Sequence, residues 1–386
     1  MNKLLATSAL VAAGLVASAG VASAQAPAPI QVVVGGFMHQ YFGYASNNDG
    51  VTFASGNGRA AAGVVSQMNK TSQQSDTEVF IGGRSTLSNG IVVGFDVQIE
   101  GNSNNGTGAN VMATAQDNID ESYLFLDGAF GRFIAGSEND APYIMHVGAP
   151  APGATWGANE AYTVNWVQRP NAVSFNDQTS PFQNGDGQRL TYFTPRFSGL
   201  QVGVSYTPNS LEDAWGFSDV RGARTNGWST GLNYTNTIMG IRVATSAGLV
   251  YYPEVDGAAA TTANGNAIKD WSYGLQLGMG AFTVGGGYRI REVSLDASDG
   301  TVYSVGVGYQ AGPIAVSASY LQSNANGTAV VGDDVVKQSI LSAAYTMGPG
   351  VDLVGSIFNV KYTDESNAST NNNSGGGAVV GIRLMF

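Results

Sequence analysis

The chain has 386 residues, no cysteine and a formal net charge of −11, with 17 Lys and Arg against 28 Asp and Glu. The lack of cysteine excludes disulfides, zinc–thiolate sites and thiol nucleophiles. The acidic balance argues against a nucleic-acid partner, which calls for a basic surface. Charged residues make up only 12% of the chain, against ~25% in soluble domains.

The N-terminal residues have the pattern of a secretory signal peptide. Lys3 precedes an apolar run that begins at Leu4, and this run ends in the small residues Ala22-Ser23-Ala24. A short cationic region, an apolar region and an A-x-A site are the parts of a cleavable export signal. The sequence therefore predicts a signal peptide over residues 1–24 and a single domain over residues 25–386.

Segments in which apolar and polar residues alternate recur through the rest of the chain. From Trp271 to Met279, aromatic and aliphatic residues occupy the odd positions, and Gly, Ser and Gln the even ones. Period-two alternation indicates β-strands with one apolar face. A soluble β-sandwich has the same alternation, but the low charge and the aromatic residues at the ends of the apolar faces favour a transmembrane β-barrel with a polar interior.

Short turns and longer polar connections alternate along the chain. Seven short turns, the first at Ser88–Gly90 and the last at Gly348–Gly350, separate eight longer connections, which predicts sixteen strands. An even number is required of single-chain bacterial barrels. The expected fold class is therefore an all-β, antiparallel transmembrane barrel. The longer connections cover about residues 46–73, 103–113, 139–186, 209–224, 253–267, 293–300, 324–335 and 363–374.

The alternation continues to the last residue of the sequence. Ile382, Leu384 and Phe386 share one face of the final segment, and Arg383 lies on the other. We expect this strand to pair with the first one, near Gln31–Tyr44, because pairing removes the exposed sheet edge. Phe386 would then face lipid, and Arg383 would face the interior.

Three segments resemble the general diffusion porins of Gram-negative bacteria. Arg189–Leu200 (RLTYFTPRFSGL) resembles their Y-x-S/T-P-x-F-x-G hairpin, Gly131–Glu138 is similar to the strand that leads into their constriction loop, and Gly381–Phe386 is similar to their C-terminal assembly signal. The resemblance implies a homotrimer in the outer membrane, in contact with lipid and lipopolysaccharide. It also implies that the third outside loop, here residues 139–186, folds into a pore for small hydrophilic solutes, with no cofactor.

Alternation indicates which charged side chains enter the expected pore. Strand residues out of phase with their apolar neighbours point inward, and acids in or beside the long loop join them. Rings of charge sort solutes by size and sign, and the excess of acids predicts a mild preference for cations. The candidate lumen and constriction residues are Arg84, Asp96, Arg189, Arg242, Arg289, Arg291, Arg383, Glu138, Asp140 and Glu160.

Other functions remain open at this point. The two histidines, His39 and His146, are too few for a convincing zinc site, so an enzyme is not expected. A substrate-selective channel for sugars or anions is the nearest alternative. A plugged, structural barrel is a weaker one, because the small residues on the inward phase favour open space.

Two pairs of adjacent acids, Asp333–Asp334 and Asp364–Glu365, lie in outside connections. Oxygen-rich loops can bind calcium. The sequence has no D-x-D-x-D-G loop, however, and adjacent surface acids are usually solvated. We expect solvated loops at these positions and predict no metal site.

Overall fold

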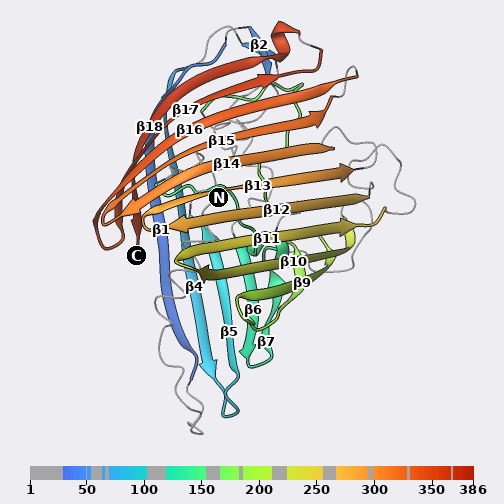
Figure 1. Ribbon diagram of the computed structural model, residues 1–386, viewed down its shortest axis with the longest axis vertical. Helices are drawn as coiled ribbons and strands as arrows, with labels where there is room; N and C mark the ends of the chain where they lie inside the picture. The colour runs from blue at the N-terminus through green and yellow to red at the C-terminus, as the bar shows by residue number, and fades with distance from the viewer. Residues whose placement is uncertain are drawn as a thin grey trace.

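The structure is a computed structural model that describes residues 29–48, 50–53, 63–65, 69–101, 119–153, 166–181, 186–210, 224–254, 267–293, 299–327, 331–366 and 368–386. The predicted signal peptide lies outside the described residues. Sixteen antiparallel strands form a closed barrel, in which neighbours along the chain are neighbours in the wall (Figure 1). The predicted fold class and strand number are confirmed.

The ring begins at β1 (Gln31–Ala45) and ends at β18 (Asn373–Met385). Two further strands, β2 (Val51–Phe53) and β3 (Gly63–Val65), form a separate hairpin in the first long connection, which the sequence pattern did not indicate. The other barrel strands are β4 (Thr71–Thr86), β5 (Val92–Glu100), β6 (Ile119–Gly128), β7 (Gly131–Ser137), β8 (Gln188–Phe193), β9 (Leu200–Asn209), β10 (Thr225–Ile238), β11 (Ile241–Tyr252), β12 (Ile268–Met279), β13 (Phe282–Val293), β14 (Gly300–Ala311), β15 (Ile314–Asn326), β16 (Asp333–Gly348) and β17 (Val351–Thr363).

Within the ranges that the structure describes, helical structure is confined to one turn each in α2 (Ala141–Ile144) and η2 (Ser369–Asn371). Among the described residues, no helix has the length and apolar character needed to cross a membrane.

The first and last strands close the barrel as the alternation predicted. β18 runs antiparallel to β1, with Phe37 opposite Met385 and His39 opposite Arg383. The backbones of Gly36 and Phe386 exchange two hydrogen bonds, of 2.9 and 3.1 Å, so the pairing extends to the last residue of the sequence. The side chain of Phe386 is exposed and that of Arg383 points inward, toward Asp352.

Along each strand, apolar side chains on the outer face alternate with buried or polar side chains on the inner face. Leu275 on β12 is 47% exposed and Val305 on β14 is 52% exposed, whereas their neighbours Gly274 and Ser304 are buried. Large apolar side chains so exposed on every part of a wall are unfavourable in water, and they suit a hydrocarbon surrounding.

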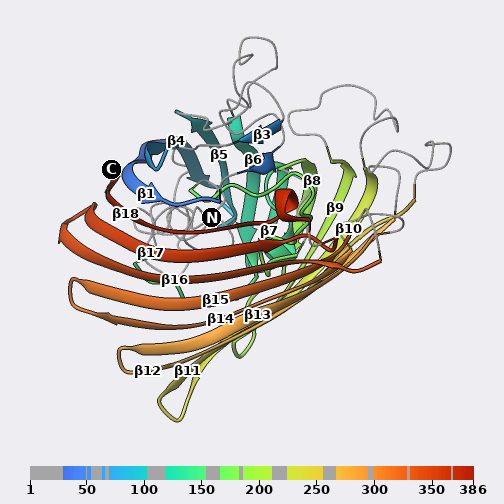
Figure 2. The ribbon, with the colours of Figure 1, turned by 90° about the horizontal axis from the view of Figure 1, so that it is seen from above.

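The two ends of the barrel differ in their connections. At one end, here called the short-turn end, tight hairpins join the strands, such as Met239–Gly240 with φ of 52° and 83°. Two successive positive φ values match the right-handed strand twist of a two-residue hairpin. The longer connections lie at the other end, here called the long-loop end. Seen from above, the strands curve around a central space, with β4 and β5 on one side and β12 and β13 on the other (Figure 2).

Candidate functional site: the barrel interior

The connection between β7 and β8 lies against the inner face of the wall in its two longer described parts, residues 138–153 and 166–181. In the first part, successive residues of the connection contact successive strands of the wall, from β9 to β12. Small or amide side chains on the inner face make these contacts with backbone groups of the connection. The contacts are Ala141 N to Ser205 Oγ of β9 (2.9 Å), Asn233 Nδ2 of β10 to Met145 O (3.0 Å), Val147 N to Ser246 Oγ of β11 (2.9 Å) and Gln276 Nε2 of β12 to Gly148 O (2.8 Å).

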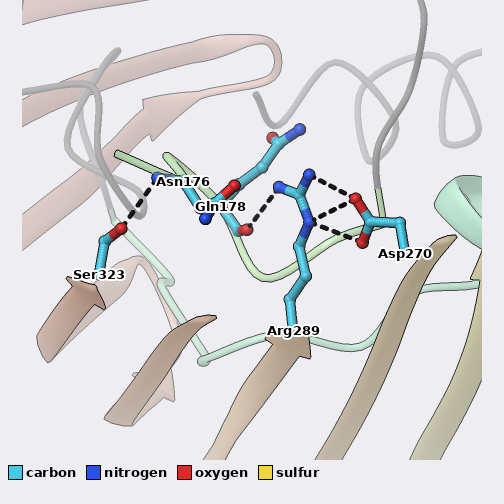
Figure 3. Close-up of polar contacts among 5 residues, drawn as sticks. All are labelled: Asn176, Gln178, Asp270, Arg289 and Ser323. Carbon is cyan, nitrogen blue, oxygen red and sulfur yellow. Dashed lines mark hydrogen bonds and ion pairs between the residues drawn. The ribbon is translucent and has the colours of Figure 1, made fainter. Parts of the chain in front are cut away.

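The second part returns along the wall in the opposite direction, nearer the long-loop end. It starts beside β17 and β18 and passes β16, β15 and β13 in turn. The contacts are Tyr362 Oη to Val167 O (3.2 Å), Asn373 Nδ2 to Gln168 O (2.6 Å), Ser174 N to Asp334 Oδ2 (2.7 Å), Asn176 N to Ser323 Oγ (2.8 Å) and Arg289 Nη1 to Gln178 O (3.2 Å), the last two drawn in Figure 3.

The small residues of the inner face make room for this connection. A Cβ added at Gly274 would collide with the carbonyl oxygen of Val147, and one added at Gly43 would collide with the Trp166 ring. The prediction that small inward residues leave open space is therefore wrong at these positions. Their physical role is to let a second layer of backbone approach the wall.

Part of the interior is apolar, which the sequence analysis also missed. Trp166, Val167 and Val173 of the connection pack with inward side chains of β1 and β16–β18 into one buried cluster. This side of the barrel interior is occupied by packed side chains. The wall members of the cluster are Tyr41, Ala45, Val336, Ile340, Ala344, Val354, Phe358, Val360, Tyr362 and Val379.

Arg289 lies on the inward phase of β13, as predicted, but it does not project into open space. Its guanidinium makes a bidentate ion pair with Asp270 of β12, with Nε 2.8 Å from Oδ1 and Nη2 2.7 Å from Oδ2. The side chains of Arg289 and Asp270 are 3% and 0% exposed. Because Nη1 also binds Gln178 O, this pair fastens the returning part of the connection to the wall (Figure 3).

Buried acids gather on the inner face of β4–β6 and at the start of the connection. Asp96, predicted from phase, is joined by Glu78 and Glu121, which the sequence analysis did not single out. Glu121 accepts hydrogen bonds from Gln98 and, at 2.6 Å, from Asn139 Nδ2. Glu78 and Arg84 both occupy even-numbered positions of β4. The alternation alone could therefore have identified Glu78 as an inward-facing residue.

Glu138 and Asp140 stand where the connection leaves β7, close to this acidic wall. Burial raises the pKa of Glu138, although the N–H of Asn139 donates to its carboxylate at 2.7 Å. Burial raises the pKa of Asp140 to about 6, and the nearby Arg189 partly offsets that rise. Asp140 caps α2 by accepting from Tyr143 N at 3.1 Å, so its charge and the docking of this turn are linked.

The remaining predicted residues occupy different parts of the inner face. Arg242 lines a hollow of about 550 Å³ near the short-turn end, together with Thr237, Gln276 and Thr283. Arg383 is 3.0 Å from Asp352. Arg84 and Arg291 lie on the inward phases of β4 and β13, Arg189 is buried on β8, and Glu160 lies outside the described residues. A role for any of them in permeation stays a prediction.

Acidic and basic side chains lie on opposite walls of the interior, and on the basic wall Asp270 neutralises Arg289. β5, with Asp96, and β13, with Arg289 and Arg291, are eight strands apart in the ring of sixteen and thus face each other across the barrel. A closed barrel with an apolar outer face and a charged, partly filled interior is the architecture of an outer-membrane channel.

Comparison with known proteins identifies the family. A profile described as Gram-negative porin matches residues 6–368, and the chain belongs to that family. An uncharacterised protein of Rickettsia conorii is 26% identical, over 62% of this chain and 69% of its own.

Solved structures share the fold at low sequence identity. The outer membrane channel DcaP of Acinetobacter baumannii matches with a TM-score of 0.59 and 12% identity, over 96% of this chain and 100% of that one. OmpT, an outer membrane protein of Vibrio cholerae, matches with a TM-score of 0.58 and 11% identity, over 92% and 98%. A porin refined at 1.8 Å matches with a TM-score of 0.55 and 15% identity, over 92% and 100%.

The buried ion pair generates a prediction about stability. Asp270→Asn leaves the Arg289 guanidinium buried without its counter-charge, and we expect a loss of about 3–5 kcal/mol of unfolding free energy. Denaturant unfolding of the barrel in lipid vesicles measures this. The control, Asp352→Asn, breaks the more exposed Arg383 pair and should cost roughly 1 kcal/mol or less. Equal losses of unfolding free energy in the two variants would contradict the conclusion that the Arg289–Asp270 pair fastens the connection to the wall.

His146 generates a prediction about pH. Its Nε2 is 3.1 Å from Thr179 Oγ1, and burial, helped by Arg289, lowers its pKa to about 3. The neutral ring therefore stabilises the folded state above pH 6.5, and that contribution is lost as the pH falls toward the folded-state pKa. Between pH 7 and pH 4 the native protein should lose up to about 3 kcal/mol more unfolding free energy than His146→Gln. Asp140 and other groups titrate in both proteins, so their contribution to the pH dependence cancels when the two proteins are compared. An unchanged difference at the two pH values would refute the assignment.

Proposed function

We propose that this porin is a general diffusion channel, which gives passive passage to small hydrophilic solutes and ions across the outer membrane. The observation that carries the proposal is the charge arrangement of the interior, with acids on β4–β6 across the barrel from Arg291 on β13, whose neighbour Arg289 is already paired with Asp270. A transverse field of this kind orients hydrated, polar solutes and disfavours apolar ones without recognising a particular molecule. The hollow beside Arg242 supports a hydrated path near the short-turn end.

The connection between β7 and β8 is proposed to narrow this path. Its two longer described parts cover the inner faces of β9–β16, and its apolar members fill the side formed by β1 and β16–β18. The remaining interior lies toward the acidic wall, where Glu138 and Asp140 begin the connection. Fixed negative charge there supports a mild preference for cations.

Assembly and location complete the proposal. The signal peptide directs export and is removed after residue 24, and the mature barrel forms a homotrimer surrounded by lipid and lipopolysaccharide. The trimer form of OmpT from V. cholerae, with a TM-score of 0.57, supports this assembly. The channel is proposed to act without a cofactor and without catalysis.

A substrate-selective channel is the second candidate. The apolar filling beside Tyr41 and Tyr362 favours it, because a filled interior leaves a narrower path than an open barrel does. A narrow path with a binding site would saturate with one class of solute, such as sugars or anions, whereas a diffusion pore would not.

Single-channel recording in a planar bilayer tests these functions. We expect large, ohmic conductance steps that close in groups of three, and a reversal potential under a salt gradient that indicates cation preference. Because the pKa of Asp140 is about 6, the carboxylate is charged at pH 7 and largely neutral at pH 5, so the preference should weaken at pH 5. Asp140→Asn should show the weaker preference at both pH values.

Two outcomes would overturn the proposal. A small conductance that one class of solute blocks at low concentration would establish the selective channel instead. No conductance from folded, inserted protein would mean a plugged, structural barrel.

A further inference from the structure

Three carboxylates converge at the long-loop end of β16 and β17. Asp334 lies at the start of β16, and Asp364 and Glu365 directly follow β17. One carboxylate oxygen of each lies within 4.8 Å of the others. The expectation that these acid pairs are solvated is wrong for Asp334 and Asp364, which are 0% and 1% exposed. Asp333, next to Asp334, is exposed as expected.

Asp334 and Asp364 carry charges that are buried at this site. In the part of the chain that the structure describes, neither Asp334 nor Asp364 has an ion-pair partner. Burying a carboxylate without a counter-charge is unfavourable by several kcal/mol in general. Such a site needs either protons or a bound cation to neutralise it.

The hydrogen bonds of Asp364 are incomplete on one side. Its Oδ2 accepts from Ser366 N at 3.1 Å, from Asn371 Nδ2 at 3.2 Å and from Ser366 Oγ. Its Oδ1 is buried and accepts no hydrogen bond from any residue that the structure describes. A buried carboxylate oxygen seldom stays without a partner, and this one belongs to the same group of converging acids. The orphaned oxygen is independent of the clustering and indicates a ligand.

We propose that Asp334, Asp364 and Glu365 bind a divalent cation, and that the cation is Ca²⁺. The group offers only oxygen donors, which excludes the nitrogen and sulfur ligands that Zn²⁺ prefers. Ca²⁺ accepts six to eight oxygens in irregular geometry, whereas Mg²⁺ demands a near-ideal octahedron. Carboxylates from one strand end and a neighbouring connection suit the less demanding ion.

The site would tie three parts of the barrel together. Asp334 Oδ2 accepts from Ser174 N of the β7–β8 connection at 2.7 Å, and its Oδ1 accepts from Glu365 N at 3.1 Å. Ca²⁺ bound here therefore holds the returning part of the connection to β16 and to the segment after β17.

Calorimetric titration of CaCl₂ into protein refolded from inclusion bodies, and thus free of lipopolysaccharide, tests the site directly. We expect one Ca²⁺ per chain and weaker binding of Mg²⁺. Asp364→Asn and Asp334→Asn should each lower Ca²⁺ affinity by at least about 10-fold. The matched control Asp333→Asn changes the same charge beside the site and should bind normally. No binding to the refolded protein, or equal weakening in all three variants, would overturn the proposal.

Unfolding in chelator and in CaCl₂ separates a cation site from a merely structural role. In chelator, Asp364→Asn should be at least as stable as the native protein, because the substitution relieves repulsion between carboxylates. In CaCl₂ the native protein should unfold at a higher temperature and the variant should not shift, since only ligand bound to the folded state stabilises it. A variant that is stabilised by Ca²⁺ as much as the native protein would exclude the site.

Discussion

The whole structure depends on one constraint, that no backbone polar group in a lipid-exposed wall goes unpaired. Hydrocarbon offers no hydrogen-bond partner, so a sheet in a membrane must close on itself. Here the closure is the pairing of β18 with β1, completed by the hydrogen bonds between Gly36 and Phe386. Once the ring is closed, alternation along each strand assigns every side chain either to the outer face or to the interior.

Closure of the barrel encloses an interior, and the β7–β8 connection lies along the inner face of the wall there. Glycine and serine on the inner face let its backbone approach, as at Gly274 beside Val147. Hydrogen bonds that Asn233 donates and that Ser205 and Ser246 accept then hold it. Arg289, which is paired with Asp270, fastens its return. At its start the connection meets the acidic side of β4–β6, where Asn139 donates to Glu121. The two longer described parts of the connection thus occupy the inner face of the wall beside β9–β13 and β15–β18.

Features that depend on the period of the alternation and on the spacing of the turns could be predicted from the sequence. It predicted the sixteen strands, the seam and the inward phase of residues such as Arg289. It could not predict that Arg289 pairs with Asp270, because cross-strand register places Asp270 opposite Arg291 and the pair forms diagonally. Nor could it predict the packing of Trp166 on Gly43, or the burial of Asp334 beneath Ser174, since both join residues more than a hundred positions apart. Small inward residues were interpreted as open space because sequence alone does not distinguish a cavity from a docking surface.

The central claim is that the connection between β7 and β8 lies on the inner wall of the folded barrel, and an engineered disulfide tests it most directly. The chain has no cysteine, so Ala149→Cys with Gly306→Cys introduces a single pair. A Cβ at position 306 would lie 3.3 Å from that of Ala149, close to the ~3.5–4.5 Å of disulfides. The account predicts that mild oxidation of the folded barrel forms this disulfide in high yield and leaves single-channel conductance unchanged. Failure to form it in folded protein, or a changed conductance once it forms, would contradict the account.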